Sequence, residues 1–213
     1  MPIPFCLASA SPARLKTLRS AGVDPRVQVS SVDEDAVVAQ ARERFGDLLA
    51  EDVALLLARA KCEDIAPLLE NEGWEGVVLG CDSVLELDGH ILGKPNDADD
   101  ARERWQQMSG RTGVLHTGHW LIDTRADGGG ATLGAVASTT VHFATLTQDE
   151  IDAYVGTGEP LNAAGAFTID GIGGPYVTSI EGDHHNVVGV SLPLLRELLQ
   201  ELDIAWHTVR ATS

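Results

Sequence analysis

Basic residues are scarce in this sequence. It has 15 lysine and arginine residues against 32 aspartate and glutamate residues, a formal net charge of −17 over 213 residues. So acidic a chain repels other polyanions, which argues against nucleic acid polymers and anionic membranes as partners. Only three of the basic residues are lysines, Lys16, Lys61 and Lys94. Because cations are so few, the position of each one bears on function.

The sequence also lacks long apolar runs and paired cysteines. No window reaches the roughly 18 consecutive apolar residues of a membrane-spanning helix. The segment MPIPFCLASASPA has no basic residue ahead of its short apolar run, which argues against a secretory signal. Cys6, Cys62 and Cys81 lie far apart and match no metal-ligand or redox spacing. We therefore expect reduced, mostly buried cysteines and a cytoplasmic protein.

Apolar residues make up 44% of the chain, which is enough for a sizeable core. Patterns of apolar and turn residues predict strands at 3–7, 26–31, 77–81, 84–87, 90–92, 113–124, 132–144 and 175–180, with a short final strand. Helices are predicted from Ser11-Pro12 to Gly22, at 47–72, from Asn96 to Met108, at 147–156, and from 186–191 onward through LPLLRELLQEL. This alternation predicts one α/β domain over residues 1–213 with a mixed sheet.

A loop of small residues ahead of a helix is the first candidate site. LASASPARLKTLRSAG places Ser9 and Ser11 before the predicted helix and Arg14 in its first turn. Unpaired backbone N–H groups and the helix dipole favour an anion at such a position. Phosphate can therefore dock here, although simple capping by Ser11 and a solvated basic helix face explain the same residues.

An acidic residue after an apolar run is the second candidate. Asp82 directly follows the strand predicted at 77–81, where open α/β sheets usually bind ligands. A buried, unpaired carboxylate is costly, so Asp82 requires a cation, a hydrogen-bond donor or a catalytic role, unless it only caps the next turn. Glu34 lies in a second acidic segment, Asp33-Glu34-Asp35, which is predicted to be a loop. Lys61 and Lys94 stand beside small or turn residues, and such point charges suit a polyphosphate, although single lysines are more often plain surface residues.

Six segments between about residue 5 and residue 200 occur in an order that is specific to one protein family. They are LASASPARLKTLRSAG, LARAKCEDIA, LGCDSVLELDGHILGKP, MSGRTGVLHTG, TVHFATLTQDEIDAYVGTGEPLNAAGAFTIDGIGG and EGDHHNVVGVSLPLLRELL. Together they resemble the Maf family of nucleoside triphosphate pyrophosphatases, also called septum formation proteins. The resemblance implies hydrolysis between the α and β phosphates of a nucleoside triphosphate, with a divalent metal, Mg²⁺ or Mn²⁺. It also implies a long, twisted mixed sheet with flanking helices and two lobes around a deep cleft, similar to inosine triphosphate pyrophosphatases, and a homodimer.

The resemblance also implies roles for individual residues. Asp82 matches the catalytic acidic residue, regarded as the proton acceptor, and Lys94 matches a phosphate-facing lysine. Lys61 and Glu34 fall on active-site positions. The nucleotide-binding residues are then Ser9, Ser11, Arg14, Ser83 and Asp170. Asp82 and Glu34 can hold the metal or activate water, and the sequence does not separate the two tasks. The second hypothesis is a regulatory binding protein that acts on cell division.

The chain departs from the family pattern at three places. Ala13-Arg14 stands where many members have two arginines, and Asn162-Ala163 stands where many have Asp-Lys. In the branch that cleaves dTTP and UTP, three positions linked to base choice are arginine, threonine and glutamine. Here they are Arg14, Ser83 and Asp170. An ionised aspartate only accepts hydrogen bonds, so we expect no strict preference for uridine and thymidine nucleotides.

Overall fold

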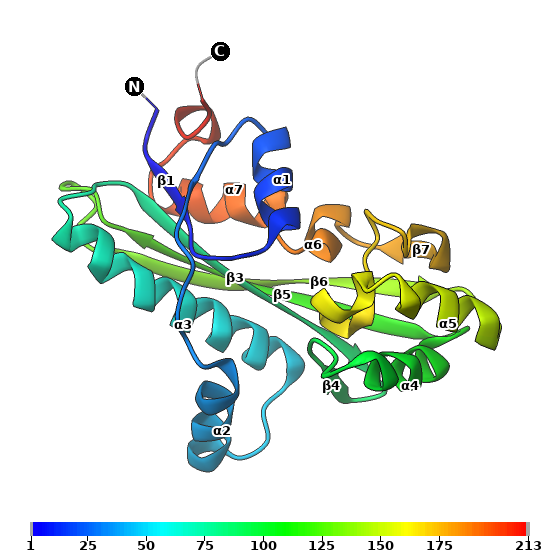
Figure 1. Ribbon diagram of the computed structural model, residues 1–213. Helices are drawn as coiled ribbons and strands as arrows, with labels where there is room; N and C mark the ends of the chain where they lie inside the picture. The colour runs from blue at the N-terminus through cyan, green and yellow to red at the C-terminus, as the bar shows by residue number, and fades with distance from the viewer. Residues whose placement is uncertain (1, 212–213) are drawn as a thin grey trace.

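A seven-stranded mixed sheet forms the centre of the molecule, which the computed structural model describes from residue 2 to residue 211 (Figure 1). The strand order is β2-β1-β3-β5-β6-β7, and β4 pairs with β3 outside that path. β1 is parallel to β2 and β3, whereas the other pairs are antiparallel. The predicted α/β fold with a mixed sheet is confirmed.

The strands are β1 (Phe5–Leu7), β2 (Arg26–Val27), β3 (Val77–Leu87), β4 (His90–Leu92), β5 (Thr112–Asp123), β6 (Thr132–Phe143) and β7 (Val177–Glu181). The helices are α1 (Pro12–Ser20), α2 (Glu34–Phe45), α3 (Ala50–Asn71), α4 (Ala98–Met108), α5 (Gln148–Gly156), α6 (His184–Val188) and α7 (Leu192–Glu201). Short 3₁₀ turns lie at Glu159–Asn162, Ala164–Ala166, Gly174–Tyr176 and Trp206–Thr208. Between residues 2 and 211 no helix is both long and apolar enough to cross a membrane.

Capping residues set the helix starts as the sequence predicts. Ser11 Oγ accepts a hydrogen bond from the backbone N–H of Arg14, and Pro12 occupies the first helical position of α1. Asp97 caps α4 through two backbone N–H groups. Thr147 caps α5 in a reciprocal capping box with Glu150. The three helices begin close to where the sequence predicts, although the capping box of α5 was not itself predicted.

Four of the predictions about individual elements are wrong. The strands predicted at 77–81 and 84–87 are one strand, β3, so Asp82 lies in the middle of a strand and not after its end. The strand predicted at 26–31 has only two residues. The helix predicted from 186–191 is two helices, because Gly189 leaves helical geometry at φ 120°. The predicted final strand is a 3₁₀ turn at Trp206–Thr208. Helix α2 was not predicted at all.

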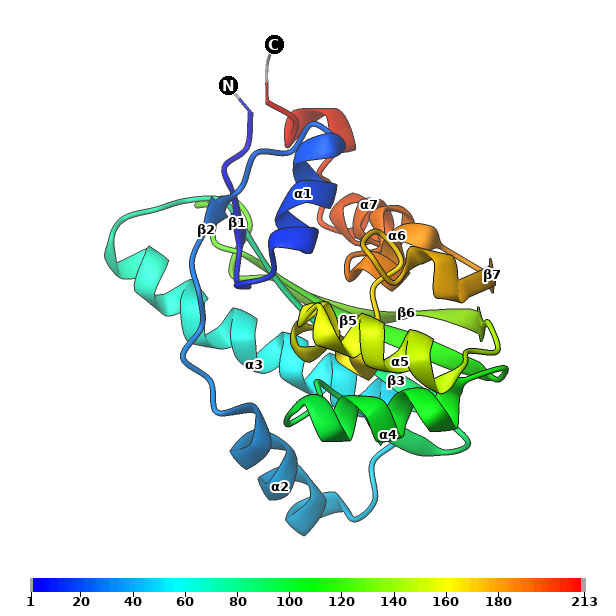
Figure 2. The ribbon, with the colours of Figure 1, turned by 45° about the vertical axis from the view of Figure 1, so that its right-hand side comes forward.

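Alternate residues of β3 face opposite layers of the molecule. On one face Val77, Leu79 and Cys81 join a core cluster with α1 and α7, whereas Leu85 and Leu87 join a second cluster with α4 and α5. These two clusters form the two lobes. On the other face lies α3, with α2 further from the sheet (Figures 1 and 2). Between the two clusters the strand carries a polar residue, Ser83.

Two glycines bring α3 close to the sheet. A Cβ on Gly80 of β3 would collide with the carbonyl oxygen of Ala58, and one on Gly118 of β5 would collide with that of Ala54. The helix can therefore lie directly on the two strands. Lys61 lies on the side of α3 that faces the sheet, four residues after the buried Leu57 and four before the buried Ile65. Its ammonium group is thus carried to the level of Asp82.

Strand pairing is interrupted along the edge of β3 that faces away from β5. Its ladder with β1 ends at Leu79, and its ladder with β4 begins at Leu85. Among the described strands, none pairs with residues 80–84 on that edge, while β5 pairs with them on the other. Asp82 and Ser83 therefore lie at an opening in the sheet, with their side chains on opposite faces of the strand.

Candidate active site

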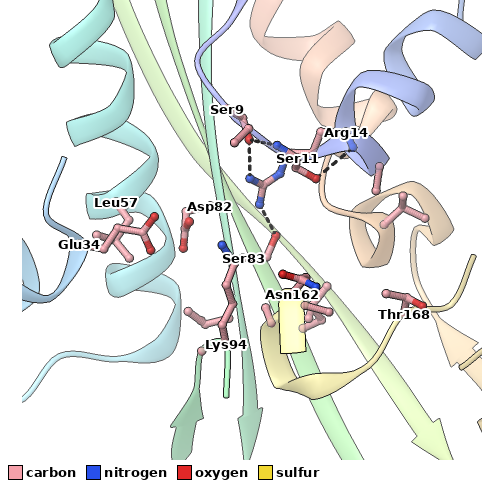
Figure 3. Close-up of a pocket in the computed structure, with 18 of the residues that line it drawn as sticks. Ser9, Ser11, Arg14, Glu34, Leu57, Asp82, Ser83, Lys94, Asn162 and Thr168 are labelled. Atoms are coloured by element: carbon pink, nitrogen blue, oxygen red, sulfur yellow. Dashed lines mark hydrogen bonds between the residues drawn. The ribbon is translucent and has the colours of Figure 1, made fainter. Parts of the chain in front are cut away.

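A cavity of about 910 Å³ lies at this opening. Its wall includes all nine residues that the sequence singles out, from the loop before α1, from α2, α3 and β3, from the segment after β4, and from the glycine-rich segment after α5. They are Ser9, Ser11, Arg14, Glu34, Lys61, Asp82, Ser83, Lys94 and Asp170. Seven of them are labelled in Figure 3. The structure thus brings together residues that are up to 161 positions apart in the chain.

Lys61 links the two acidic residues of the cavity. Its Nζ lies 2.5 Å from Asp82 Oδ1 and 2.7 Å from Glu34 Oε1. The Lys61 and Asp82 side chains are only 12% and 11% exposed, whereas Glu34 is 42% exposed. A carboxylate as buried as Asp82 needs a partner, and Lys61 supplies it. Asp82 Oδ2 is left for a further interaction.

The two carboxyl groups differ in acidity. Burial raises the pKa of Asp82 above its ordinary value, and the charges of Lys61 and Arg14 only partly offset that effect. Burial also acts to raise the pKa of Glu34, but the hydrogen bond and charge of Lys61, with a smaller contribution from Lys94, outweigh it and lower the pKa. Asp82 is therefore the better proton acceptor of the two, whereas Glu34 holds its negative charge.

Arg14 is held in one orientation by three acceptors. Its Nε donates to the carbonyl oxygen of Gly189 at 2.7 Å. Nη1 donates to Ser9 Oγ at 3.1 Å, and Nη2 donates to Ser83 Oγ at 3.0 Å (Figure 3). Ser9 Oγ also accepts from the backbone N–H of Ser11 at 3.2 Å. The loop before α1 is therefore ordered, and an arginine is fixed at the helix N-terminus, an arrangement that suits an anion.

The two remaining charged residues differ in their contacts. Lys94 is exposed, and within residues 2–211 it makes neither a hydrogen bond nor an ion pair. Asp170 forms an ion pair with Lys16 of α1, with Nζ and Oδ2 3.5 Å apart. Lys94 is thus available to a ligand, whereas Asp170 presents a carboxylate whose charge is partly balanced.

Sequence reasoning missed several residues of the cavity wall. Val38 and Arg42 line it, and with Glu34 they follow helical spacing along one face of α2. Asp33, which caps α2 through the backbone N–H of Ala36, was the available signal for this helix. Asn162 and Thr168 line the opposite side, labelled in Figure 3.

Glu159 organises the segment that carries Thr168 and Asp170. Its carboxylate accepts hydrogen bonds from Tyr154 Oη at 2.9 Å and Thr168 Oγ1 at 2.6 Å. It also accepts from the backbone N–H groups of Ile172 and Gly173. Burial acts to raise the pKa of Glu159, but these four donors outweigh it and lower the pKa. Glu159 is therefore committed to holding the loop.

The acidic side chains of the cavity suit a metal cation that arrives with the substrate. Within the described part of the chain, no group of three histidine, cysteine or acidic side chains is arranged to hold a metal ion. Asp82 and Glu34 are two carboxylates on either side of one ammonium group. Mg²⁺ is commonly bound by one or two carboxylates, with phosphate oxygens and water completing its shell. Asp82 and Glu34 therefore fit a metal completed by phosphates, and not a resident metal centre.

The family model for Maf-like proteins matches residues 4–202. A nucleoside triphosphate pyrophosphatase of Salinispora tropica is 54% identical over 205 residues, which cover 96% of this chain and 86% of that protein. One of Leifsonia xyli is 50% identical over 200 residues, with 94% and 93% covered. One of Streptomyces coelicolor is 52% identical over 196 residues, with 92% and 89% covered. The chain belongs to the family of Maf-like proteins.

Solved structures give a weaker match. The Staphylococcus aureus Ham1 protein aligns with a TM-score of 0.37 at 13% identity, covering 66% of this chain and 72% of that one. A dITP/XTP pyrophosphatase of Mycobacterium abscessus aligns with a TM-score of 0.36 at 15% identity, covering 68% and 76%. Scores at this level carry no information about the site.

Proposed function

We propose that this protein hydrolyses nucleoside triphosphates between the α and β phosphates, giving a nucleoside monophosphate and pyrophosphate. The observation that carries the proposal is Lys61 held between Asp82 and Glu34 in a cavity that Arg14 and Lys94 also line. A triphosphate needs fixed positive charge and a base for water, and the cavity combines both. The names of the relatives point to the same activity.

The chemistry follows from the different environments of the Asp82 and Glu34 carboxylates. Asp82 Oδ1 accepts from Lys61, so Oδ2 is the atom that takes a proton from the attacking water, helped by the raised pKa of this group. Lys61, Lys94 and Arg14 bind and orient the phosphate chain. Asp82 and Glu34 would hold Mg²⁺ or Mn²⁺, which would supply charge stabilisation at the α-phosphorus. Leu57, Leu115 and Phe167 give the cavity an apolar wall for the nucleoside.

The biological role that we propose is removal of non-canonical or surplus nucleotides from the nucleotide pool. A homodimer and a cytoplasmic location remain predictions from the sequence. Within residues 2–211 no contact favours the alternative of a regulatory protein in cell division, and an interaction module has no need of a lysine held between two carboxylates.

The test is turnover in H₂¹⁸O with Mg²⁺ or Mn²⁺ and a panel of canonical and modified nucleoside triphosphates. We expect pyrophosphate as a product, with the ¹⁸O label in the monophosphate because water attacks the α-phosphorus. Release of a diphosphate and inorganic phosphate would contradict the proposal. Glu34→Gln should reduce turnover, whereas Asp35→Asn, an exposed neighbour on α2, is the matched control and should not.

A further inference from the structure

A chain of hydrogen bonds leads from the cavity through the sheet to α6. Arg14 Nη2 donates to Ser83 Oγ at 3.0 Å, Ser83 Oγ and Thr117 Oγ1 are 2.9 Å apart, and Thr117 Oγ1 donates to the carbonyl oxygen of Asn186 at 3.0 Å. Thr117 and Asn186 are fully buried, and Arg14 is 8% exposed. The chain therefore joins α1, β3, β5 and α6, and runs from the half-buried Ser83 on the cavity wall to the fully buried Thr117 and Asn186.

Only one direction of donation is consistent along this chain. The guanidinium of Arg14 can only donate, and the carbonyl of Asn186 can only accept. Thr117 has one hydroxyl hydrogen, which goes to Asn186, so the hydrogen between Ser83 and Thr117 must come from Ser83. Ser83 thus turns a lone pair toward Arg14 and has no hydrogen left for a ligand.

The far end of the chain is itself fixed. The Asn186 side chain donates through Nδ2 to the carbonyl oxygen of Leu115 at 3.2 Å and to Thr139 Oγ1 at 3.0 Å. Thr139 Oγ1 in turn donates to the carbonyl oxygen of Asp183 at 3.1 Å. These contacts hold α6 on β5 and β6, so the acceptor for Thr117 has a defined position.

We infer that Thr117 is a positioning residue for substrate binding, acting through Ser83 on Arg14. Arginine has five N–H donors, and Arg14 uses three of them on Gly189, Ser9 and Ser83. One N–H on each Nη remains, a pair suited to two oxygens of one phosphate. Thr117 fixes the Ser83 hydroxyl, and this fixes the plane of the guanidinium before the nucleotide arrives. The inference rests on the proposed function and adds to it a residue that affects substrate binding without touching the substrate.

The principal test is Thr117→Val, which removes the hydroxyl and keeps the shape of the side chain. The Ser83 hydroxyl can then rotate away from Arg14. We expect KM for the nucleoside triphosphate to rise about tenfold while kcat stays within about twofold, because a phosphate contact made equally in the ground and transition states acts on KM. Thr117→Ser retains the hydroxyl and should restore KM. If Thr117→Val does not fold, Ser83→Ala breaks the chain one step earlier and should raise KM in the same way.

Thr124→Val is the matched control, because Thr124 also accepts one hydrogen bond and donates one, both with the backbone of Gly76, and does not line the cavity. It should lower Tm as Thr117→Val does, yet leave KM unchanged, since no hydrogen bond joins Thr124 to Ser83, Arg14 or α6. Equal increases of KM in both valine variants would overturn the inference and assign the effect to a general loss of stability.

A double-mutant cycle separates positioning from stability. Lysine in place of Arg14 has no planar guanidinium for Ser83 to orient. Thr117→Val should therefore change KM by less than about twofold in the Arg14→Lys background. A further tenfold increase there would overturn the inference.

A readout without turnover is the NMR signal of the Arg14 guanidinium, whose two Nη groups should give separate resonances in the wild type and merge in Thr117→Val. Identical spectra would overturn the inference. A wild-type protein that cleaves no nucleoside triphosphate would instead refute the proposed function, and the NMR comparison would still decide the orientation of Arg14.

Discussion

Replacing Lys61 by methionine tests whether this lysine is part of the catalytic centre and also of the folded core. Methionine keeps the length of the side chain but removes the charge between Asp82 and Glu34. Removal of one partner from a buried charge pair costs about 3–5 kcal/mol in general. Glu34 is 42% exposed, so water compensates for much of its loss, and Asp82 at 11% exposure bears most of the cost. We therefore expect about 3 kcal/mol near neutral pH, which corresponds to a decrease in Tm of about 6–12 °C for a chain of this length.

The cost should depend on pH, with a sign that follows from Asp82. Its pKa is already raised by burial in the wild type, and the loss of Lys61 removes the main charge that opposes this increase. A carboxyl group with a raised pKa in the folded state contributes stability that is fully present below its unfolded pKa and is lost as pH rises through its folded pKa. The deficit of Lys61→Met should thus be small near pH 4 and grow toward neutral pH.

Lys94→Met is the matched control, because Lys94 is exposed and makes no ion pair or hydrogen bond within residues 2–211. Its Tm should stay within about 2 °C of the wild type at every pH, although its kcat/KM should fall with the loss of a phosphate contact. The assay is thermal unfolding of both variants between pH 4 and pH 8, together with pyrophosphate release. An equal Tm deficit of Lys61→Met at pH 4 and pH 7.5 would refute the charge argument.

Three further predictions concern the chemistry and the substrate. Asp82→Asn should lower kcat by about 100-fold or more, the scale of a lost general base, with the far-UV circular dichroism unchanged; near-normal turnover would remove Asp82 from the chemistry. Arg42→Ala should raise KM for triphosphates. Arg44→Ala should not, because the Arg44 guanidinium of the wild type lies over the Phe45 ring. Equal KM values in the two variants would exclude Arg42 from the binding site. Asp170→Gln should shift kcat/KM toward UTP and dTTP, because an amide both donates and accepts. A wild type that already prefers UTP and dTTP by about 100-fold, or about 2.7 kcal/mol, would show that Asp170 does not set base choice.

The membership of the site could be predicted from the sequence, but its interactions could not. Lys61 and Lys94 have similar local surroundings in the sequence, yet one is buried between two carboxylates and the other is exposed. The difference depends on Gly80 and Gly118, which let α3 lie directly on the sheet. Close approach of a helix to two strands is a tertiary contact, so no local pattern reveals it.

Helix α2 is a second feature of the site that the sequence does not reveal. Apart from its alanines, it has few apolar residues to mark a buried face, mainly Val37 and Val38, and only Ala41 is fully buried. Its helical periodicity is therefore weak, and the segment containing Glu34 was predicted as an acidic loop. The helix matters to the site because it places Glu34, Val38 and Arg42 on one wall of the cavity. Glu34 therefore lines the cavity with the other predicted residues, but from an element that the sequence did not indicate.

The position of Asp82 shows why a wrongly predicted element still led to a residue of the cavity wall. Ligands bind where neighbouring strands diverge and the backbone of one strand is left open, and the end of a strand is the usual case. Here β3 continues through Asp82, but β1 leaves its edge at Leu79 and β4 joins it only at Leu85. The opening lies within the length of the strand, so side chains from both of its faces reach the same cavity. Asp82 meets Lys61 from one face, and Ser83 meets Arg14 from the other. A strand that ended at Cys81 could not have brought the partner of Lys61 and the partner of Arg14 to one cavity through two consecutive residues.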